Sequence, residues 1–390
     1  MIAHAPRGDG TQHNGGMDIT APTPLLGGLS PERFMRRHWQ KAPLLVRQAV
    51  PGGAALASRA ELFALAGQDG VESRLVVHGD SGWTLRHGPL PRGALPKVPQ
   101  PRWTLLVQGV DGHVPAAHAL LSRFRFVPDA RLDDLMVSWA SDGGGVGPHV
   151  DSYDVFLLQV QGRRRWRIAP LRDATLVPDV PLRILQHFEP EQEWVLEPGD
   201  MLYLPPGWAH DGVAEGECMT ASIGFRAPPR EVLGREVLQR VLDAAEEPEA
   251  DALYEDRTQP ATDTPGRIPD RLQAFAADAV GRLLKDPRTF ACALGELLSE
   301  PKPSIWFDAG DGLAAGQGVR LDRRTRMMYD DHHVFINGES FRAGGRDATL
   351  MRRLADARHL AARDVARLSD DAQALLDDWV ASGWAGPEPT

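Results

Sequence analysis

The sequence predicts an α+β, mainly β fold: a β-barrel or double-sheet jelly roll, then helices and a small mixed module. Three observations support this. Between about residues 70 and 226, short β-prone runs recur between Gly, Pro and Asp breaks, which is typical of barrels and sandwiches. From Glu231 onward, apolar residues recur with helical spacing. After Pro303, two short strands and an Asn337-Gly338 turn precede further helices.

The chain's composition is that of a globular protein. Its 390 residues suit two or three domains, and it is 42% hydrophobic and 25% charged. The net charge of −10 argues against a general nucleic-acid binder, because phosphate contacts need clustered Lys and Arg, and it suits a basic partner. Neither Cys218 nor Cys292 belongs to a CxxC pair, and we find no membrane-spanning run or signal peptide. We therefore expect a cytoplasmic protein with no membrane partner.

The N-terminal region is expected to become structured only after a tail. Residues 1–25 are rich in Gly, His, Pro and Thr, and we expect them to be disordered; Met17 is a second candidate start. Ser30 and Pro31 are a natural N-cap and first helical residue, so a helix should begin there and stop by Pro43. A short strand at 44–46 and a helix at 60–66 should follow.

Residues 26–228 are expected to form the catalytic β-domain. Its β-prone runs are bounded by turn residues and are spaced as short strands. They lie at 75–77, 103–107, 135–139, 155–160, 165–168, 201–204 and 219–223.

Two further units are expected after the β-domain. Residues 229–300 read as helices at 231–245, 268–284 and 290–298, separated by an acidic, proline-containing linker at 246–265. Residues 301–390 combine strands at 327–329 and 333–336 with helices at 348–357, 362–368 and 371–380. A helix–hairpin–helix unit of this size looks like a winged-helix module.

The segment from Gly143 to Asp151 carries half of a candidate metal site. His149 and Asp151 are two residues apart, and on a strand such residues point to the same side. The preceding glycines let the chain run close to a pocket mouth. An H-x-D triplet alone is a weak signal, because His often makes a structural hydrogen bond and Asp is a common turn residue.

The segment from Glu197 to His210 supplies the other half. A Pro-Gly-Asp turn introduces a short apolar strand, and Pro205-Pro206-Gly207 ends it just before His210. Two imidazoles and one carboxylate fill three positions of an octahedron and leave three open, as in non-haem Fe(II) oxygenases. Zinc favours four ligands, or three and a water. We therefore predict an iron site at His149, Asp151 and His210.

These two segments resemble a known family. His149-Val-Asp151 with distal His210 and the Gly-Asp-x-Leu-Tyr-Leu-Pro-Pro-Gly-Trp run looks like the JmjC cupin fold, a double-stranded β-helix. The run from Gly145 to Ile168 is similar to bacterial ribosomal oxygenases, which hydroxylate an arginine of large-subunit ribosomal protein L-sixteen. The resemblance covers roughly residues 28–385. It implies Fe(II), 2-oxoglutarate and O₂, a basic ribosomal substrate, a helical dimerisation segment and a homodimer.

A second set of residues is expected to hold 2-oxoglutarate. In Arg163–Ile168, strand alternation places Arg164 with Trp166 and Ile168 on an apolar face, where an arginine needs an anionic partner. The distal carboxylate of 2-oxoglutarate is such a partner, and the resemblance implies the family's co-substrate arginine at this position. A salt bridge to a buried acid is the alternative. Arg163 and Arg165 are expected to be solvated or surface-paired.

Two other polar residues are weaker candidates for the site. The resemblance implies that Ser138 contacts 2-oxoglutarate, although a strand serine is often only a satisfied hydroxyl. Asp142 lies near the expected substrate mouth and could pair with a guanidinium; a loop-capping role is the alternative. His187 lies at a loop edge, where we expect a structural role, and the pair His332-His333 forms no ligand pattern and is expected on the wing hairpin.

The resemblance implies oxidative decarboxylation of 2-oxoglutarate and insertion of a hydroxyl group into a protein side chain. Hydroxylation of a histidine stays open, and so do three rival functions. An N-methyl demethylase would use the same oxidant, and a small-molecule dioxygenase is disfavoured by the extra modules. A nucleic-acid-binding regulator is disfavoured because residues 301–390 carry 12 Lys and Arg against 14 Asp and Glu. We therefore expect no direct DNA binding.

Overall fold

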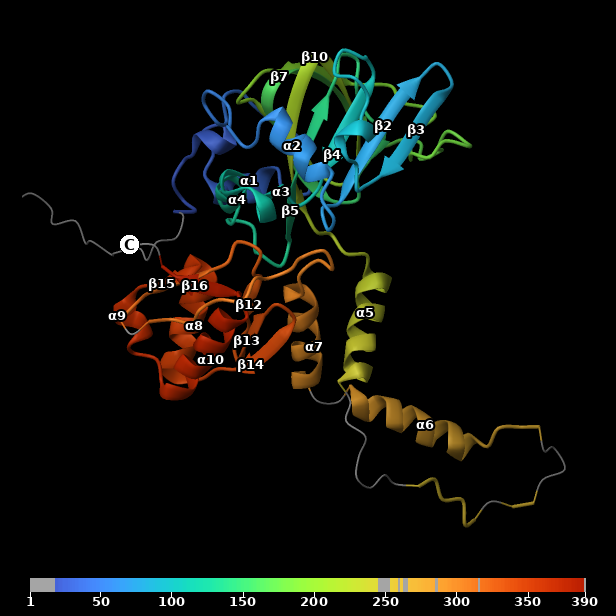
Figure 1. The fold of residues 1–390 in the computed structure, drawn as a ribbon. Helices are drawn as coiled ribbons and strands as arrows, with labels where there is room; N and C mark the ends of the chain where they lie inside the picture. The colour runs from blue at the N-terminus through green and yellow to red at the C-terminus, as the bar shows by residue number, and fades with distance from the viewer. Residues whose placement is uncertain are drawn as a thin grey trace, which may run out of the picture.

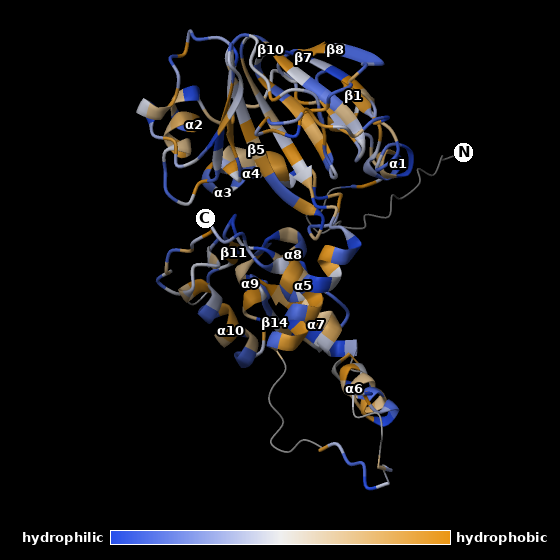
Figure 2. Cartoon of the chain, turned by 90° about the vertical axis from the view of Figure 1, so that its right-hand side faces the viewer, coloured by the Kyte–Doolittle hydropathy of each residue, from blue (hydrophilic) through white to orange (hydrophobic). Residues whose placement is uncertain are grey.

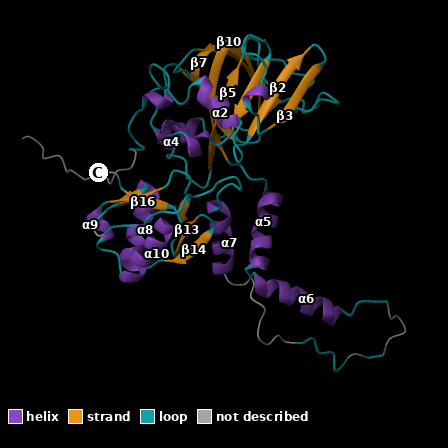
Figure 3. Ribbon diagram, viewed as in Figure 1, coloured by secondary structure: helices purple, strands orange, loops and turns teal. Residues whose placement is uncertain are grey.

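The chain folds into a β-domain and a mixed C-terminal module, with helices beside the module (Figure 1). The computed structural model describes residues 18–244, 253–258, 260–261, 266–284, 287–314 and 316–388. Met17 and most of the acidic linker predicted at 246–265 lie outside these residues. In Figure 3 the strands gather mainly in the upper domain, whereas helices dominate below it.

The N-terminal tail predicted over 1–25 is too long at its C-terminal end. A 3₁₀ helix, η1 (Pro24–Leu26), is capped by the Thr23 side chain, and Leu25 and Leu26 are buried. Burial of two leucines anchors this stretch in the core, which the polar residues before them concealed. Helix α1 (Pro31–Arg37) begins at the predicted Ser30 cap, but it ends at Arg37 rather than continuing to Pro43.

Ten strands build the β-domain and pair in one continuous antiparallel sheet that folds over on itself. The pairing order is β1-β9-β7-β10-β5-β4-β2-β3, and β6 and β8 join β10 and β7. The strands are β1 (Leu44–Val46), β2 (Ser73–Gly79), β3 (Gly82–His87), β4 (Trp103–Val107), β5 (Leu132–Ala140), β6 (His149–Val150), β7 (Asp154–Pro170), β8 (Gln192–Leu196), β9 (Met201–Leu204) and β10 (Trp208–Phe225). The other helices of this domain are α2 (Arg59–Ala66), η2 (Arg92–Ala94), α3 (Val110–His113) and α4 (Pro115–Ser122).

The long strands β7 and β10 run through both halves of the jelly roll. The sequence predicted two strands, at 155–160 and 165–168, but both are parts of β7. Gly162 between them adopts φ +64°, and a Cβ there would lie 2.1 Å from the Glu217 carbonyl. Gly162 therefore bends one strand instead of ending it, opposite a register shift in β10 between Glu215 and Met219.

The alternation of side chains along these strands separates a core from a pocket. On β5, Leu135, Val137 and Trp139 are buried in a large aromatic and aliphatic core, while Met136 and Ser138 line a pocket. Figure 2 shows this alternation of apolar and polar residues along the strands of the barrel. Residues on one face of β5 therefore pack in the core, and residues on the other face line the pocket.

The C-terminal half contains three longer helices and the mixed module. Helix α7 packs on α5 and also on the hairpin of the module, where its Gly295 allows close approach of Phe335. The elements are α5 (Arg230–Asp243), α6 (Asp270–Leu283), α7 (Pro287–Ser299), β11 (Val319–Leu321), β12 (Met327–Tyr329), β13 (His333–Ile336), β14 (Glu339–Arg342), α8 (Gly345–Ala357), β15 (His359–Leu360), α9 (Ala362–Val365), α10 (Asp370–Ala381) and β16 (Ala385–Pro387). Within the described ranges, no helix has both the length and the apolar character needed to cross a bilayer.

Candidate active site

Strands β6 and β10 bring the three predicted metal ligands together. His149 on β6 lies directly opposite His210 on β10 in the antiparallel register, and Asp151 follows β6 by one residue. One ligating atom from each of the three side chains lies within 4.8 Å of the other two. In the described part of the chain, this is the one group of three or more such side chains close enough to share an ion.

Both imidazoles are held in the tautomer that a metal needs. The Nδ1 atom of His149 lies 2.9 Å from the Gly147 carbonyl, and that of His210 lies 3.0 Å from the Trp208 carbonyl. A carbonyl oxygen can only accept, so Nδ1 carries the proton in each ring and Nε2 presents a lone pair. The Nε2 atoms face the Asp151 carboxylate at 4.0 and 3.6 Å.

Burial keeps His210 neutral. It lowers the pKa of His210 to about 4, and the neighbouring His149 acts in the same direction while Asp151 opposes them. A neutral imidazole is the ligating form. Two imidazoles and one carboxylate on adjacent backbone segments therefore fit a divalent transition metal with open coordination positions.

The ligands open into a pocket inside the barrel with a volume of about 420 Å³. His149, Asp151 and His210 line it together with Ser138, Arg164 and Trp166. This volume is in the range of small-molecule sites.

Arg164 is one of three arginines that line this pocket, and the one that the sequence predicted. It is 5% exposed, on the same face of β7 as Trp166 and Ile168. Its Nη1 donates to Ser138 Oγ at 3.2 Å, while its buried Nε and Nη2 have no hydrogen-bond partner. The described residues place no acid on this guanidinium, so the salt-bridge alternative finds no support. Two orphaned donors on a buried cation fit the carboxylate of a dicarboxylic acid.

The arginines on the opposite face of β7 are paired with acids, as predicted. Arg163 and Arg165 contact Glu215, Arg165 also contacts Glu193, and Arg167 contacts Asp211. The alternation of one strand thus separates arginines that are paired with acids from the buried Arg164.

Asp142 does not occupy the predicted substrate position. It is exposed, it does not line the pocket, and its Oδ1 accepts from the Gly216 backbone N–H at 2.8 Å. The carboxylate caps the turn at the bend of β10, which is the loop-capping alternative. Proximity in sequence to the glycine run was misleading because the chain turns outward before it reaches His149.

The other histidines lie outside the pocket. His187 is exposed in the loop between β7 and β8, and His333 at the start of β13 contacts Asp330.

Besides Asp151, the acids that line the pocket are Asp133 and Asp134, at the start of β5, and the sequence pattern did not single them out. Asp134 shares a strand face with Met136 and Ser138, and it is 6% exposed. Burial raises its pKa, and Asp133 adds to the effect, while Lys302 opposes it. Asp134 lies four residues before Ser138, so on a strand both side chains point to the same side. The sequence could have indicated this, but the predicted strand began only at residue 135.

Comparisons with known proteins give the family. Residues 119–233 match the JmjC domain, and residues 282–386 match the ROXA-like winged helix, which confirms the predicted fold class. The chain is 37% identical to the ribosomal protein uL16 3-hydroxylase of Escherichia coli, over 81% of this chain and 86% of that protein. It is 28% identical to a probable ribosomal oxygenase of Haemophilus influenzae, over 92% and 96% of the two chains.

A solved structure of an E. coli relative also matches. The ribosomal oxygenase YcfD in complex with cobalt and 2-oxoglutarate superposes with a TM-score of 0.78 at 30% identity, covering 93% of this chain and 99% of that one. A metal and 2-oxoglutarate thus occupy a protein of the same fold, and the donors described above suit both. The chain belongs to the JmjC ribosomal oxygenases and is a 2-oxoglutarate-dependent dioxygenase.

Proposed function

We propose that this enzyme hydroxylates an arginine side chain of large-subunit ribosomal protein uL16, also called protein L-sixteen. The observation that carries the substrate assignment is the buried carboxylate of Asp134 in the same pocket as the three candidate ligands. The identity to the uL16 3-hydroxylase supports it.

We assign the metal to His149, Asp151 and His210, and the distal carboxylate of 2-oxoglutarate to Arg164 and Ser138. When bound, Fe(II) and 2-oxoglutarate supply the O₂ activation and the oxidative decarboxylation. The two carbonyl-bound Nδ1–H groups orient the imidazoles, and Arg164 fixes the far end of the co-substrate.

A cationic substrate side chain suits the opposite part of the pocket. Only one oxygen of Asp134, Oδ2, makes hydrogen bonds in the described structure, to the Gly109 N–H at 3.0 Å and to Lys302 Nζ at 2.8 Å. A guanidinium could pair with the remaining oxygen, and such charge-assisted bonds are strong when buried. The net charge of −10 favours encounter with a basic ribosomal protein.

The test incubates the protein with Fe(II), 2-oxoglutarate and purified uL16, and locates the product by peptide mass spectrometry. We expect a gain of 16 Da on one arginine. A gain of 16 Da on a histidine, or a loss of 14 Da, would instead identify a histidine hydroxylase or a demethylase.

The Asp134→Asn variant sharpens this test. An amide keeps the size of the side chain but cannot ion-pair, so we expect the KM for uL16 to rise at least about tenfold, or roughly 1.4 kcal/mol. The KM for 2-oxoglutarate should stay unchanged. Normal uL16 kinetics in this variant would remove Asp134 from the substrate site.

We also propose that the enzyme is a cytoplasmic homodimer. A ribosomal substrate favours the cytoplasm. Helices α5 and α6 expose apolar side chains that a second copy could cover, among them Leu238, Leu242, Phe275 and Val280.

A further inference from the structure

The C-terminal module is fastened to the barrel near the start of β5. Arg326 of the module donates to the carbonyls of Asp129 and Leu132, at 3.4 and 3.2 Å. Arg323 donates to the Gly112 carbonyl at 2.6 Å, and Arg125 of the barrel donates in return to the Ala355 carbonyl at 2.9 Å. These charge-assisted bonds hold the module against the strand that carries Ser138 and Asp134.

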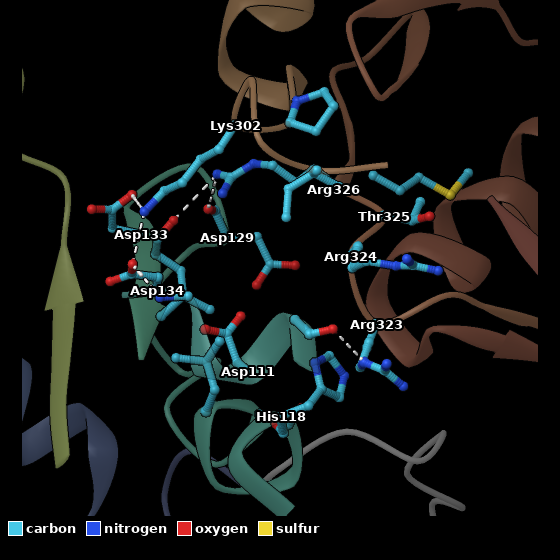
Figure 4. Close-up of a pocket in the computed structure, with 18 of the residues that line it drawn as sticks. Asp111, His118, Asp129, Asp133, Asp134, Lys302, Arg323, Arg324, Thr325 and Arg326 are labelled. Carbon is cyan, nitrogen blue, oxygen red and sulfur yellow. Dashed lines mark hydrogen bonds and ion pairs between the residues drawn. The ribbon is translucent and has the colours of Figure 1, made fainter. Parts of the chain in front are cut away.

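Lys302, just after α7, contacts two acids that line the catalytic pocket. Its Nζ lies 2.8 Å from Asp134 Oδ2 and 3.4 Å from Asp133 Oδ1 (Figure 4). Burial works against the charge of Lys302, but the carboxylates of Asp134 and Asp133 outweigh it and raise the pKa of the amine. Lys302 is therefore a firmly charged partner of both acids.

The two acids border two different cavities. Asp133 and Asp134 line the small interdomain cavity of Figure 4, together with Lys302 and Arg326. They also line the catalytic pocket, whereas Lys302 does not. The Asp134 carboxylate thus lies between Lys302 of the winged-helix module and the catalytic pocket.

We propose that Lys302 is a positioning residue for substrate recognition: it keeps the Asp134 carboxylate ionised and oriented so that it can receive a cationic substrate side chain. This inference rests on the proposed function and extends it to the C-terminal module. The barrel alone would present an acid without its counter-charge, and the module completes the specificity site.

The surroundings of Asp134 explain why a counter-charge is needed. Asp133 adjoins it in β5, and Asp111 on α3 is a third nearby acid, whose pKa is raised to about 6, by burial first and by Asp134 as well. Asp133 has Arg226 as a second partner at 3.2 Å. Lys302 makes the one ion pair recorded for Asp134 among the described residues. An isolated buried carboxylate takes up a proton or turns toward solvent, and either change removes it as a partner for a cation.

The test compares two full-length variants, Lys302→Met and Lys302→Arg, on a uL16 peptide that carries the target arginine and on its citrulline analogue. Citrulline keeps the shape of arginine without its charge. We expect Lys302→Met to raise the KM for the arginine peptide about tenfold, with kcat and the KM for 2-oxoglutarate within twofold of wild type. The preference for arginine over citrulline should fall by the same factor, and Lys302→Arg should restore it to within threefold.

A matched control separates this role from simple loosening of the interface. Arg323→Met removes another contact between module and barrel, the one to the Gly112 carbonyl, but leaves Asp133 and Asp134 untouched. Its KM for the arginine peptide should stay within twofold of wild type. An equal loss in Arg323→Met and Lys302→Met would overturn the proposal, because the effect would then come from domain attachment alone.

A double variant makes the dependence on Asp134 explicit. If Lys302 acts through Asp134, Lys302→Met should add less than twofold to the loss already present in Asp134→Asn. Full additivity of the two losses would overturn the proposal, and so would a Lys302→Met enzyme that retains its arginine preference. A wild-type enzyme that turns over neither peptide would refute the proposed substrate instead, so the two failures are distinguishable.

Discussion

The catalytic pocket and the interdomain cavity both contain arginines withdrawn from solvent, but these arginines are satisfied differently. Arg326 at the interdomain cavity donates to three backbone carbonyls, those of Leu298, Asp129 and Leu132. Arg164 in the pocket donates only to Ser138 and leaves Nε and Nη2 without partners. One guanidinium joins two parts of the protein, and the other has two donor atoms that no described residue pairs.

The two arginines differ in whether the folded protein itself satisfies their hydrogen-bond donors. A buried cation costs free energy unless its donors are satisfied, so a fold that leaves two donors open gains from a bound anion. Substitution of Arg164 should therefore alter activity, whereas substitution of Arg326, whose donors join two parts of the protein, should alter stability.

The largest effect is expected from His149→Ala. The variant loses one of three proposed ligands, so product formation should fall at least about a thousandfold, or roughly 4 kcal/mol. The melting temperature without added metal should change little, because the imidazole is partly exposed and makes one hydrogen bond. Turnover within tenfold of wild type would contradict the ligand assignment.

The next effect should come from Arg164→Met, which removes the open donors but keeps the bulk of the side chain. We expect the KM for 2-oxoglutarate to rise about a hundredfold, or roughly 3 kcal/mol, the scale of two charge-assisted hydrogen bonds. Arg165→Met on the opposite face of β7 is the control, because it loses only surface ion pairs with Glu193 and Glu215. Unchanged co-substrate kinetics in Arg164→Met would place 2-oxoglutarate elsewhere.

A smaller effect, on stability alone, is expected from Asp111→Asn at the interdomain cavity. Burial raises the pKa of Asp111 to about 6 from an ordinary value of 3.8, so the folded protein holds this proton more tightly than the unfolded chain. The free energy of unfolding of the wild type therefore falls as pH rises from about 4 to 6, and the penalty persists above pH 6.

Asparagine is neutral at every pH and avoids this penalty. A shift of about two pKa units corresponds to about 3 kcal/mol, and the unpartnered amide N–H groups offset part of it. The variant should be about 2 kcal/mol more stable than wild type at pH 8 and about 1 kcal/mol less stable near pH 4, as measured by urea denaturation. A difference that does not change with pH would show that Asp111 is not a buried acid of this kind.

Local chemistry alone predicted a large part of this protein. The spacing of His149 and Asp151 requires only that the segment be extended, and the Pro-Pro-Gly stop before His210 is a local backbone constraint. The placement of Arg164 against Trp166 and Ile168 follows from the period of two along a strand. The Ser30 cap and the strands at 103–107, 201–204, 327–329 and 333–336 were predicted correctly because they too depend on short stretches of sequence.

The features that only the tertiary structure decided depend on contacts between segments that lie far apart in the chain. Two strands were predicted on either side of Gly162, but pairing with β10 keeps β7 continuous. Asp142 was a plausible substrate acid until the bend of β10 brought Gly216 to it, and Asp134 entered the pocket because the sheet curls around that end of β5. Lys302 reaches Asp134 across 168 residues. A periodic pattern determines which side of a strand a residue occupies, whereas long-range packing determines what it meets there.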